Sequence, residues 1–401
     1  MKLLILSTKL PYPPRDGGAI ATLNLATGLA RSGMEVTMLT FNTRKHYFPP
    51  GEIPAELRQQ IRFLVVNHDT SVNPVSALIN LLFSRRPYIA QRFRSRSFAT
   101  ELKSILESGS FDIVQLEGPY LDAYIPLIKK HSPAKISCRA HNVEHEIWER
   151  RWKNDPWMPT RYYYRNLAAR IRRLEQELVK KIDLLIPISD RDREHLLSEK
   201  PELKSITIPA GIDLSAYPRN NVKKPGEKDI CFIGALDWAP NQEGLIWFIY
   251  KVLPHLMEHD PDIRLHIAGR NAPERFIHKI TQPSIVYHGE VEDAGTFMNA
   301  HRVMVAPLLS GSGIRVKILE GMARGMCVVT TPIGAEGIPA EHGKHLMIAE
   351  DGEHFAKSIM QLLNDNALAT HLSSEARNFI LEKFDTFTIA SNLGDFYKQM
   401  T

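Results

Sequence analysis

The segment Pro307–Ile338 reads PLLSGSGIRVKILEGMARGMCVVTTPIGAEGI and places a glycine loop between a buried strand and a helix. The apolar run before it ends at Val305–Ala306. The loop Gly311-Ser312-Gly313 follows, and we expect a helix to begin near Ile314. Free amide groups and the positive end of the helix dipole suit such a start to a phosphate group. Since glycine lets an anion approach the backbone closely, the segment predicts an anion-binding turn beside a parallel sheet.

Two cations and one carboxylate follow in the expected helix. Arg315 and Lys317 fall in its first turn, where the dipole disfavours cations, so an anionic ligand accounts for them better. Glu320 lies one turn after Lys317, and a carboxylate there is able to accept hydrogen bonds from two vicinal hydroxyl groups. A plain helix start with a Lys–Glu surface pair remains the alternative, because glycine loops before helices are common.

Short apolar runs alternate with helical patterns along the rest of the chain. The runs are continuous rather than alternating, which is typical of parallel strands buried on both faces. In the first half they are Leu3–Ser7, Glu35–Thr40, Arg62–Val66, Asp112–Leu116, Lys135–Arg139, Asp183–Ser189 and Ser205–Pro209. In the second half they are Asp229–Gly234, Ile263–Gly269, Ile285–His288, Arg302–Pro307, Met326–Thr330 and Leu346–Ala349. The pattern predicts two consecutive α/β domains with doubly wound, Rossmann-like sheets.

A polar stretch separates the two series of strands. Residues 217–228 read YPRNNVKKPGEK, with two prolines and a glycine, and indicate a linker. We therefore expect a first domain over residues 1–216 and a second over residues 229–385. Ligands of such sheets bind beyond the carboxyl ends of the strands, so a cleft between the two domains is the expected site.

Composition narrows the class of protein. The 401 residues are 43% hydrophobic and 24% charged, which is ordinary for a globular protein of two or three domains. No apolar stretch approaches about 20 residues, so no spanning helix is expected. The early run Leu3–Leu6 is too short for a signal-peptide core. Cys138, Cys231 and Cys327 lie far apart and are expected to be reduced, buried thiols of a cytoplasmic protein.

Charge is distributed unevenly along the chain. The net charge is +5, but residues 1–220 have a balance of +10 and residues 221–401 a balance of −5. Two basic segments with interleaved aromatic residues, 84–96 and 148–173, lie in the first half. They suit anionic lipid headgroups or a lipid diphosphate, and a solvated helix face is the equal alternative. Nucleic acid is the weaker alternative. We expect peripheral contact with an anionic membrane through residues 85–96 and 150–173.

Two further motifs follow strands of the first domain. Gly17 and Gly18 stand between the first strand and a helix, where their amides are able to approach a ligand or simply form a tight turn. The run RAHNVE, residues 139–144, places His141 just beyond a strand end, in a polar cluster that points into the expected cleft. A structural histidine is the alternative. Glu117-Gly118 follows another strand of the first domain and is a further candidate for contact with a second substrate, the acceptor.

These motifs together resemble glycosyltransferase family 4, the "glycosyl transferases group 1" domain of the GT-B fold. That family usually carries two glutamates separated by seven residues in its donor site. Glu320 matches the second glutamate, which in the family binds the donor ribose, whereas Ser312 replaces the first. The loop resembles a subgroup that reads GSGIRVKILE. The resemblance implies that the amides of Gly311, Ser312, Gly313 and Ile314 hold the donor sugar instead.

The resemblance extends over nearly the whole chain and implies further donor-site residues. Gly269 and Arg270, in LHIAGR, lie near the nucleotide; Val291, in HGEV, contacts the base through main-chain groups. Glu336, in TTPIGAEG, is a ligand or a structural carboxylate beside the nucleotide. His141 aligns with the family's histidine near the donor sugar, and Gly17-Gly18 with its N-terminal glycine loop. Residues 386–401 are implied to cross back as a helix onto the first domain.

Relatives often have arginine and lysine where this chain has Ala235 and Pro240, so Arg315 and Lys317 are expected to neutralise the diphosphate. The implied function is a retaining glycosyltransferase that uses a nucleotide-diphosphate sugar and a glycan or lipid-linked acceptor, in surface polysaccharide or glycoconjugate synthesis. No cofactor and no metal are expected. The strings at Asp190 with Asp192 and at Asp260 with Asp262 are interpreted as a helix start and a loop.

Three alternatives remain at this stage. A GT-B epimerase would turn over a nucleotide sugar without an acceptor. A catalytically inert GT-B scaffold is kept open by the missing first glutamate at Ser312. A nicotinamide dehydrogenase is disfavoured, because no G-x-G-x-x-G motif with an acid about 20 residues later follows the first strand.

Overall fold

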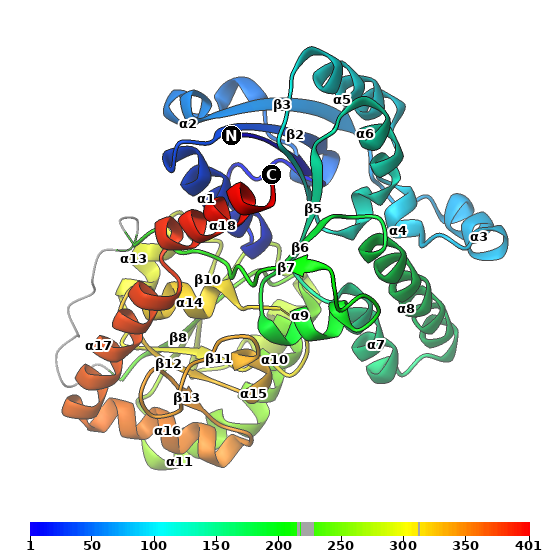
Figure 1. Ribbon diagram of the computed structural model, residues 1–401. Coiled ribbons are helices and arrows are strands. Elements are labelled where there is room, and N and C mark those ends of the chain that lie inside the picture. Colours follow the sequence, from blue (N-terminus) through cyan, green and yellow to red (C-terminus); the bar gives the residue numbers. More distant parts are fainter. Residues whose placement is uncertain (215–216, 218–227, 312) are drawn as a thin grey trace. The chain divides into compact units, whose positions relative to one another are not determined.

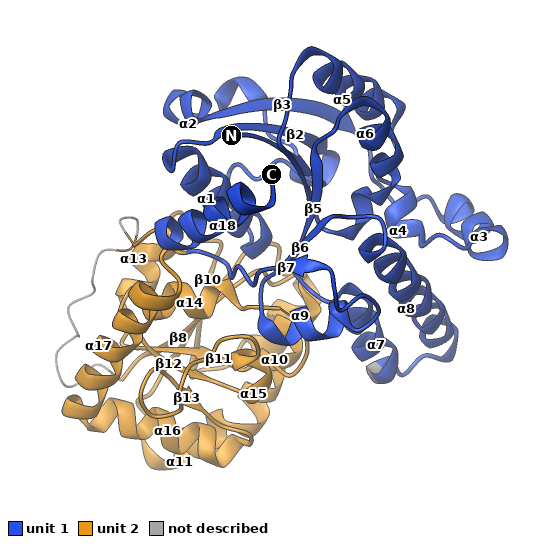
Figure 2. Cartoon of the chain, viewed as in Figure 1, with its two compact units in different colours: residues 1–211, 386–401 blue, residues 212–385 orange. Residues whose placement is uncertain are grey.

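The computed structural model describes residues 1–214, 217, 228–311 and 313–401. The chain divides into two compact units, which Figure 2 shows in blue and orange. Unit 1 comprises residues 1–211 and 386–401, and unit 2 comprises residues 212–385. The division falls earlier than the expected end of the first domain at residue 216, because Ile212 pairs with the end of unit 2. Its amide donates to the carbonyl of Phe384 at 2.7 Å.

Unit 1 contains a seven-stranded parallel sheet of order β3-β2-β1-β4-β5-β6-β7. Its strands are β1 Lys2–Ser7, β2 Glu35–Thr43, β3 Ile61–His68, β4 Ile113–Glu117, β5 Lys135–Ala140, β6 Leu184–Pro187 and β7 Lys204–Ser205. Its α-helices are α1 Gly17–Arg31, α2 Ala55–Gln60, α3 Pro74–Phe83, α4 Tyr88–Gln91, α5 Arg96–Ser108, α6 Ile125–His131, α7 Glu144–Asn154, α8 Met158–Val179, α9 Asp190–Leu197 and α18 Thr386–Met400.

Unit 2 contains a six-stranded sheet of order β10-β9-β8-β11-β12-β13, also parallel. Its strands are β8 Ile230–Ile233, β9 Leu265–Ala268, β10 Ile285–Gly289, β11 Val303–Ala306, β12 Cys327–Thr330 and β13 Met347–Ile348. Its helices are α10 Ala239–Lys251, α11 Leu253–His259, α12 Glu274–Ile280, α13 Ala294–Asn299, α14 Val316–Ala323, α15 Pro332–Ala335, α16 Gly352–Asn364 and α17 Asn366–Lys383.

The continuous apolar strands are buried on both faces, as their sequence pattern predicted. Alternate residues of β1 enter different cores: Leu4 and Leu6 pack in one, and Leu3 and Ile5 in the other. The strand order reverses beside β1 in unit 1 and beside β8 in unit 2. Ligands of doubly wound sheets bind beyond the carboxyl ends of the strands at these reversals, so the two Rossmann-like α/β units each present one expected binding edge.

The last helix, α18, packs on α1 within unit 1 (Figure 1). Gly28 of α1 faces Ala390, and a Cβ atom added at Gly28 would lie 2.6 Å from the Ala390 Cβ. Further along α18, the buried Tyr397 donates its hydroxyl hydrogen to Gln115 Oε1 at 2.6 Å. The same hydroxyl lies 2.9 Å from Ser137 Oγ, so α18 is tied to both β4 and β5.

Replacing Gly28 by alanine should destabilise unit 1 through this close approach. Elsewhere in a helix the change stabilises by about 0.5–1 kcal/mol, but here overpacking should cost about 1–3 kcal/mol. Urea unfolding measures the difference. Gly51→Ala is the control, because an added Cβ there meets nothing within 4 Å. A Gly28→Ala chain as stable as the unmodified protein would contradict the packing of α18 on α1.

Candidate functional site

The glycine loop of unit 2 connects β11 to α14. Gly311 and Gly313 have φ angles of 109° and 75°, in the left-handed region that favours glycine. Ser312 lies outside the described residues. The helix begins at Val316, two residues later than the sequence predicted, because Arg315 has a non-helical backbone (φ −85°, ψ 89°). Arg315 is therefore at the N-cap position and buried, and its expected place in the first turn was wrong.

Lys317 occupies the first turn of α14. Its Nζ donates to Asn241 Oδ1 at 2.8 Å and lies 4.3 Å from the centre of the Phe232 ring. In the described part of the chain, no acidic side chain lies within ion-pair distance of this ammonium. Burial, together with the nearby Arg315, lowers the pKa of Lys317 to about 7. An anion that binds beside this buried amine would strongly stabilise its protonated form.

Glu320 lies one turn further along α14 and is held by Tyr217. The Tyr217 hydroxyl donates to Glu320 Oε1 at 2.8 Å, and the Arg324 guanidinium lies 4.8 Å from the centre of the Tyr217 ring. Burial raises the pKa of Glu320. Tyr217 was expected to lie in a linker, and its contact with Glu320 was not predicted from the sequence. The Tyr217 hydroxyl therefore already bonds to one of the two carboxylate oxygens of Glu320.

The turn that carries Glu336 is tied to the glycine loop's own strand. Thr330 Oγ1 donates to the Ala306 carbonyl at 2.7 Å, and Thr331 Oγ1 donates to the Leu308 carbonyl. Thr331 Oγ1 also accepts from the amide of Gly334 at 3.0 Å and so caps α15. Glu336 directly follows this short helix. The structure thus brings the two ends of the segment Pro307–Ile338 close together.

Gly269, Arg270 and Val291 follow neighbouring strands at the same edge of the sheet. A Cβ atom at Gly269 would lie 2.1 Å from the carbonyl oxygen of Gly234, so the close approach of the two chain segments requires glycine there. The carbonyl of Arg270 accepts from the amide of Leu236 at 2.9 Å. Val291 lies just beyond β10, three strands away from β11, or about 14 Å at ~4.8 Å per strand.

In unit 1, Gly17 and Gly18 are the first two residues of α1. Asp16 caps the helix by accepting from the amide of Ala19 at 3.0 Å, and it pairs with Lys9 Nζ at 2.5 Å. Burial opposes ionisation of Asp16, but Lys9 and the cap together lower its pKa. An added Cβ at Gly18 would make only ordinary contacts. Packing within unit 1 therefore does not explain the glycine at position 18.

His141 follows β5 and is held by a buried carboxylate. Its Nε2 lies 2.6 Å from Glu117 Oε2, at the end of the neighbouring strand β4. Glu117 also accepts from Thr22 Oγ1 at 2.8 Å and lies 3.7 Å from Nη1 of the fully buried Arg139. Burial raises the pKa of Glu117, but Arg139 and His141 outweigh it and lower this pKa to about 2. Glu117 therefore stays ionised and positions His141.

Glu117 was expected on the acceptor side, and its pairing with His141 was not predicted from the sequence. The available signal was the register of two adjacent parallel strands, which sets Glu117 opposite Arg139. The contact of Glu144 was not predicted either: its Oε2 accepts from the Tyr120 hydroxyl at 2.7 Å. Burial raises the pKa of Glu144 to about 7. Two carboxylates near the same strand ends thus have opposite pKa shifts.

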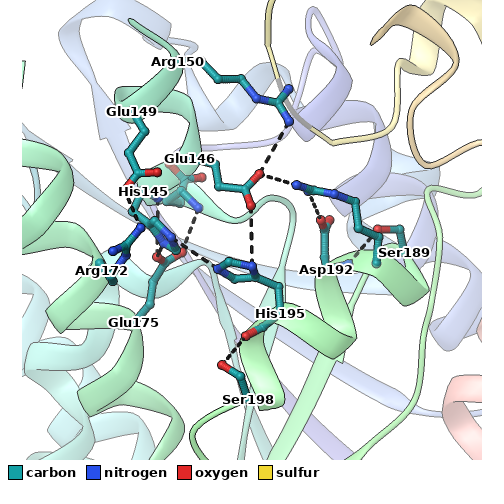
Figure 3. A network of polar contacts seen from close by, with 12 residues as sticks. His145, Glu146, Glu149, Arg150, Arg172, Glu175, Ser189, Asp192, His195 and Ser198 are labelled. Carbon is teal, nitrogen blue, oxygen red and sulfur yellow. Dashed lines mark hydrogen bonds and ion pairs between the residues drawn. The ribbon is translucent and has the colours of Figure 1, made fainter. Parts of the chain in front are cut away.

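A polar network beyond His141 fixes the start of α7 (Figure 3). Glu175 of α8 accepts from the amide of Glu144 at 2.7 Å and lies 2.6 Å from His145 Nδ1. His145 Nε2 in turn lies 3.3 Å from Nε2 of His195 on α9. The network joins three helices and supports the segment that carries His141. Among the described residues, no group of three or more His, Cys, Asp or Glu side chains is suited to hold a metal ion.

The two Asp-x-Asp strings have the local roles that the sequence indicated. Asp190 begins α9, and the cap residue Ser189 accepts from the amide of Asp192 at 3.2 Å. Asp260 follows α11 and pairs with Lys228 at 2.7 Å.

The fold and these strand-end clusters define a GT-B protein with two Rossmann-like units. Comparison with known families agrees: residues 15–216 match the model "Glycosyltransferase Family 4" and residues 227–365 match "Glycosyl transferases group 1". The chain belongs to glycosyltransferase family 4 and is a glycosyltransferase.

Proteins of similar sequence match different shares of the chain. A 44.6 kDa protein of the cps region of Klebsiella pneumoniae is 25% identical and covers 98% of each chain. Phosphatidyl-myo-inositol mannosyltransferase of Mycobacterium leprae is 26% identical over 48% of this chain and 53% of its own.

Solved structures share the fold over the full length. Sucrose-phosphate synthase of Thermosynechococcus elongatus has a TM-score of 0.72 at 17% identity, covering 100% of this chain and 99% of its own. Anabaena HepE in complex with UDP-glucose has a TM-score of 0.67 at 14% identity, covering 100% of both chains.

Glu117→Gln should lower stability, because Arg139 would remain buried without its carboxylate. The expected loss at pH 7 is about 3 kcal/mol in urea unfolding. The pKa of Glu117 is lowered, so its contribution exists above pH 4.5 and disappears as the pH falls towards 2. The difference between the two proteins should shrink in that interval. Glu107→Gln, at a half-exposed carboxylate, is the control. A constant difference across this pH range would contradict the assignment.

Proposed function

We propose that this glycosyltransferase transfers a sugar, with retention and without a metal, from a nucleotide-diphosphate sugar to a glycan or lipid-linked acceptor. The setting is the synthesis of surface polysaccharide or glycoconjugate. The observation that carries the proposal is the buried Lys317 in the first turn of α14, with its pKa lowered to about 7 beside Arg315. The HepE complex with UDP-glucose and the phosphatidyl-myo-inositol mannosyltransferase support the classes of donor and acceptor.

Charge stabilisation of the leaving group is the main task of unit 2. When the bond between the anomeric carbon and the β-phosphate oxygen breaks, negative charge grows on the diphosphate. The amides at the start of α14, Lys317 and Arg315 supply positive charge there, so the protein itself provides the role that a metal has elsewhere. The neutral amine of Lys317 takes up a proton as the anion binds.

The sugar-transfer step is proposed as a same-face displacement. The glycosidic bond to phosphate breaks through an oxocarbenium-like transition state, and the acceptor oxygen bonds to the anomeric carbon from the same face. The acceptor proton passes to the departing phosphate oxygen. His141, positioned by Glu117, lies near the sugar and phosphates in this proposal.

The rest of the donor is assigned to the carboxyl edge of unit 2. Glu320 binds the ribose hydroxyl groups in exchange for Tyr217, and main-chain groups at Val291 contact the base. Gly269 and Arg270 lie between these two places. The span of about 14 Å from β11 to β10 suits an extended nucleotide. The other assigned donor residues are Gly311, Ser312, Gly313, Ile314 and Glu336 on unit 2, and Gly17 and Gly18 on unit 1.

A panel of nucleotide sugars, screened by thermal stabilisation, identifies the donor for the kinetic tests. With that donor, Lys317→Met should lower kcat/KM by roughly 10²–10³-fold, because the charge on the leaving diphosphate is no longer balanced. Glu320→Gln should raise KM by about tenfold or more. Lys344→Met, at an exposed lysine that pairs with Glu341, is the matched control. Turnover is expected to persist in excess EDTA.

Unchanged kinetics in both site variants would refute the assigned donor site. Donor turnover without any acceptor, giving an isomerised nucleotide sugar, would show an epimerase. Absence of binding and of hydrolysis across the whole panel would show an inert scaffold.

Binding of UDP should be linked to proton uptake. The pKa of Lys317 is about 7, so at pH 8 most of this amine is neutral and must be protonated to pair with the diphosphate. We expect uptake of up to about one proton per UDP at pH 8, with an affinity that falls as the pH rises above 7. Titration calorimetry in buffers of different ionisation enthalpy measures the uptake. Lys317→Met should abolish it, and a buffer-independent enthalpy in the unmodified protein would contradict the linkage.

A further inference from the structure

Helix α3 of unit 1 exposes an apolar stripe along one face. Its residues recur at the i, i+3, i+4, i+7 spacing, which places them on one face of the helix. They are Val75, Leu78, Ile79 and Leu82, with exposed fractions of 66%, 57%, 54% and 66%, followed by Phe83 at 84%. No charged residue occurs in residues 70–84. Such a face normally packs against a core, but here it points into solvent.

The opposite face of α3 holds the helix in place. Asn80, its buried residue, donates to the carbonyl of Arg86 at 3.1 Å. Arg170 of α8 donates to the carbonyl of Asn80 at 3.1 Å and to that of Leu81 at 2.7 Å. Asn73 caps the start of the helix by accepting from the amide of Ser76. These hydrogen bonds fix the orientation of α3, so the apolar stripe is held facing the solvent.

A second exposed apolar group lies where α7 leads into α8. Trp157, Met158 and Tyr162 have exposed fractions of 64%, 69% and 69%. They belong to or directly precede α8, the same helix whose Arg170 holds α3. Figure 1 shows α3 and the connection between α7 and α8 projecting from one side of unit 1. We call this group and the α3 stripe together the apolar rim.

Exposed cations lie on the same segments of the chain as the apolar rim. Arg85 follows α3, and Lys153, Arg161 and Arg165 are exposed on α7 and α8. The acidic residues in that region are engaged: Asp155 accepts from Thr160, and Glu149 pairs with Arg172. A projecting apolar helix with cations, tryptophan and tyrosine on these segments suits the interface of an anionic bilayer.

We infer that unit 1 docks on a bilayer containing anionic phospholipid through the apolar rim. Side chains of α3 enter the region between headgroups and acyl chains, and these cations contact the phosphates. Stable attachment of a peripheral protein takes two such signals, apolar insertion and a basic patch, and the surface supplies both. None of the helices in the described ranges is long and apolar enough to cross a membrane. The inference extends the expected contact through 85–96 and 150–173 to α3, and it does not depend on the proposed reaction.

Vesicle flotation without donor or acceptor tests the docking directly. The full chain should float with vesicles of phosphatidylcholine and about one third phosphatidylglycerol. It should float much less with phosphatidylcholine alone and less at high salt. The double variant Leu78→Glu/Leu82→Glu should reduce the bound fraction about tenfold or more, because two carboxylates would have to enter the interface.

Leu381→Glu on α17 is the matched control, since Leu381 and Leu78 are both 57% exposed. It should bind vesicles like the unmodified protein. Circular dichroism and thermal unfolding confirm that each variant folds. The inference is overturned if the unmodified protein does not float, or if the double variant floats equally well. It is also overturned if ultracentrifugation shows a dimer that the double variant dissociates while vesicles bind neither protein. Because vesicles here contain no substrate, a failed donor assay leaves these outcomes unaffected.

Discussion

Neutralisation of buried charge distinguishes the two units and organises the site. In unit 1 the fully buried Arg139 has an internal counter-charge, because Glu117 lies 3.7 Å away at the end of the next strand. In unit 2, no carboxylate of the described chain pairs with Lys317, and burial lowers the pKa of this amine to about 7. The Arg139–Glu117 pair of unit 1 neutralises its charges within the protein and needs no ligand. The arrangement in unit 2 leaves the amine partly neutral at pH 7, and an incoming anion would stabilise its charged form.

The Glu117 cluster also explains why the last helix belongs to unit 1. Tyr397 of α18 bonds to Gln115 and lies beside Ser137, two residues before Glu117 and Arg139 on their respective strands. The chain therefore supports the His141 end of β5 from two directions: α18 contacts the strands, and the Glu175 network holds the start of α7. His141 gains a defined position from elements that are more than 200 residues apart in the sequence.

Tyr217 shows how unit 2 supplies a hydrogen-bond donor to the buried carboxylate of Glu320. The phenol donates to Glu320 and stacks under Arg324, and its carbonyl accepts from Arg377. Burial and the neighbouring Glu320 raise the pKa of this phenol, so it remains a hydrogen-bond donor at neutral pH. Donor ribose, in the proposed function, offers the same kind of hydroxyl donor to the same carboxylate. The exchange preserves the hydrogen bond that a buried carboxylate needs.

The sequence by itself determined the alternation of strands and helices and the family, because continuous apolar runs and glycine-bearing strand ends are local signals. It also indicated where the two expected binding edges lie, since parallel strands bring their carboxyl ends together whatever the side chains are. Only the tertiary structure decided the pairing of Glu117 with His141, the Tyr217–Glu320 contact and the exposure of α3. Each depends on which surfaces meet across long stretches of chain. An apolar helix face has the same sequence pattern whether another part of the protein covers it or not.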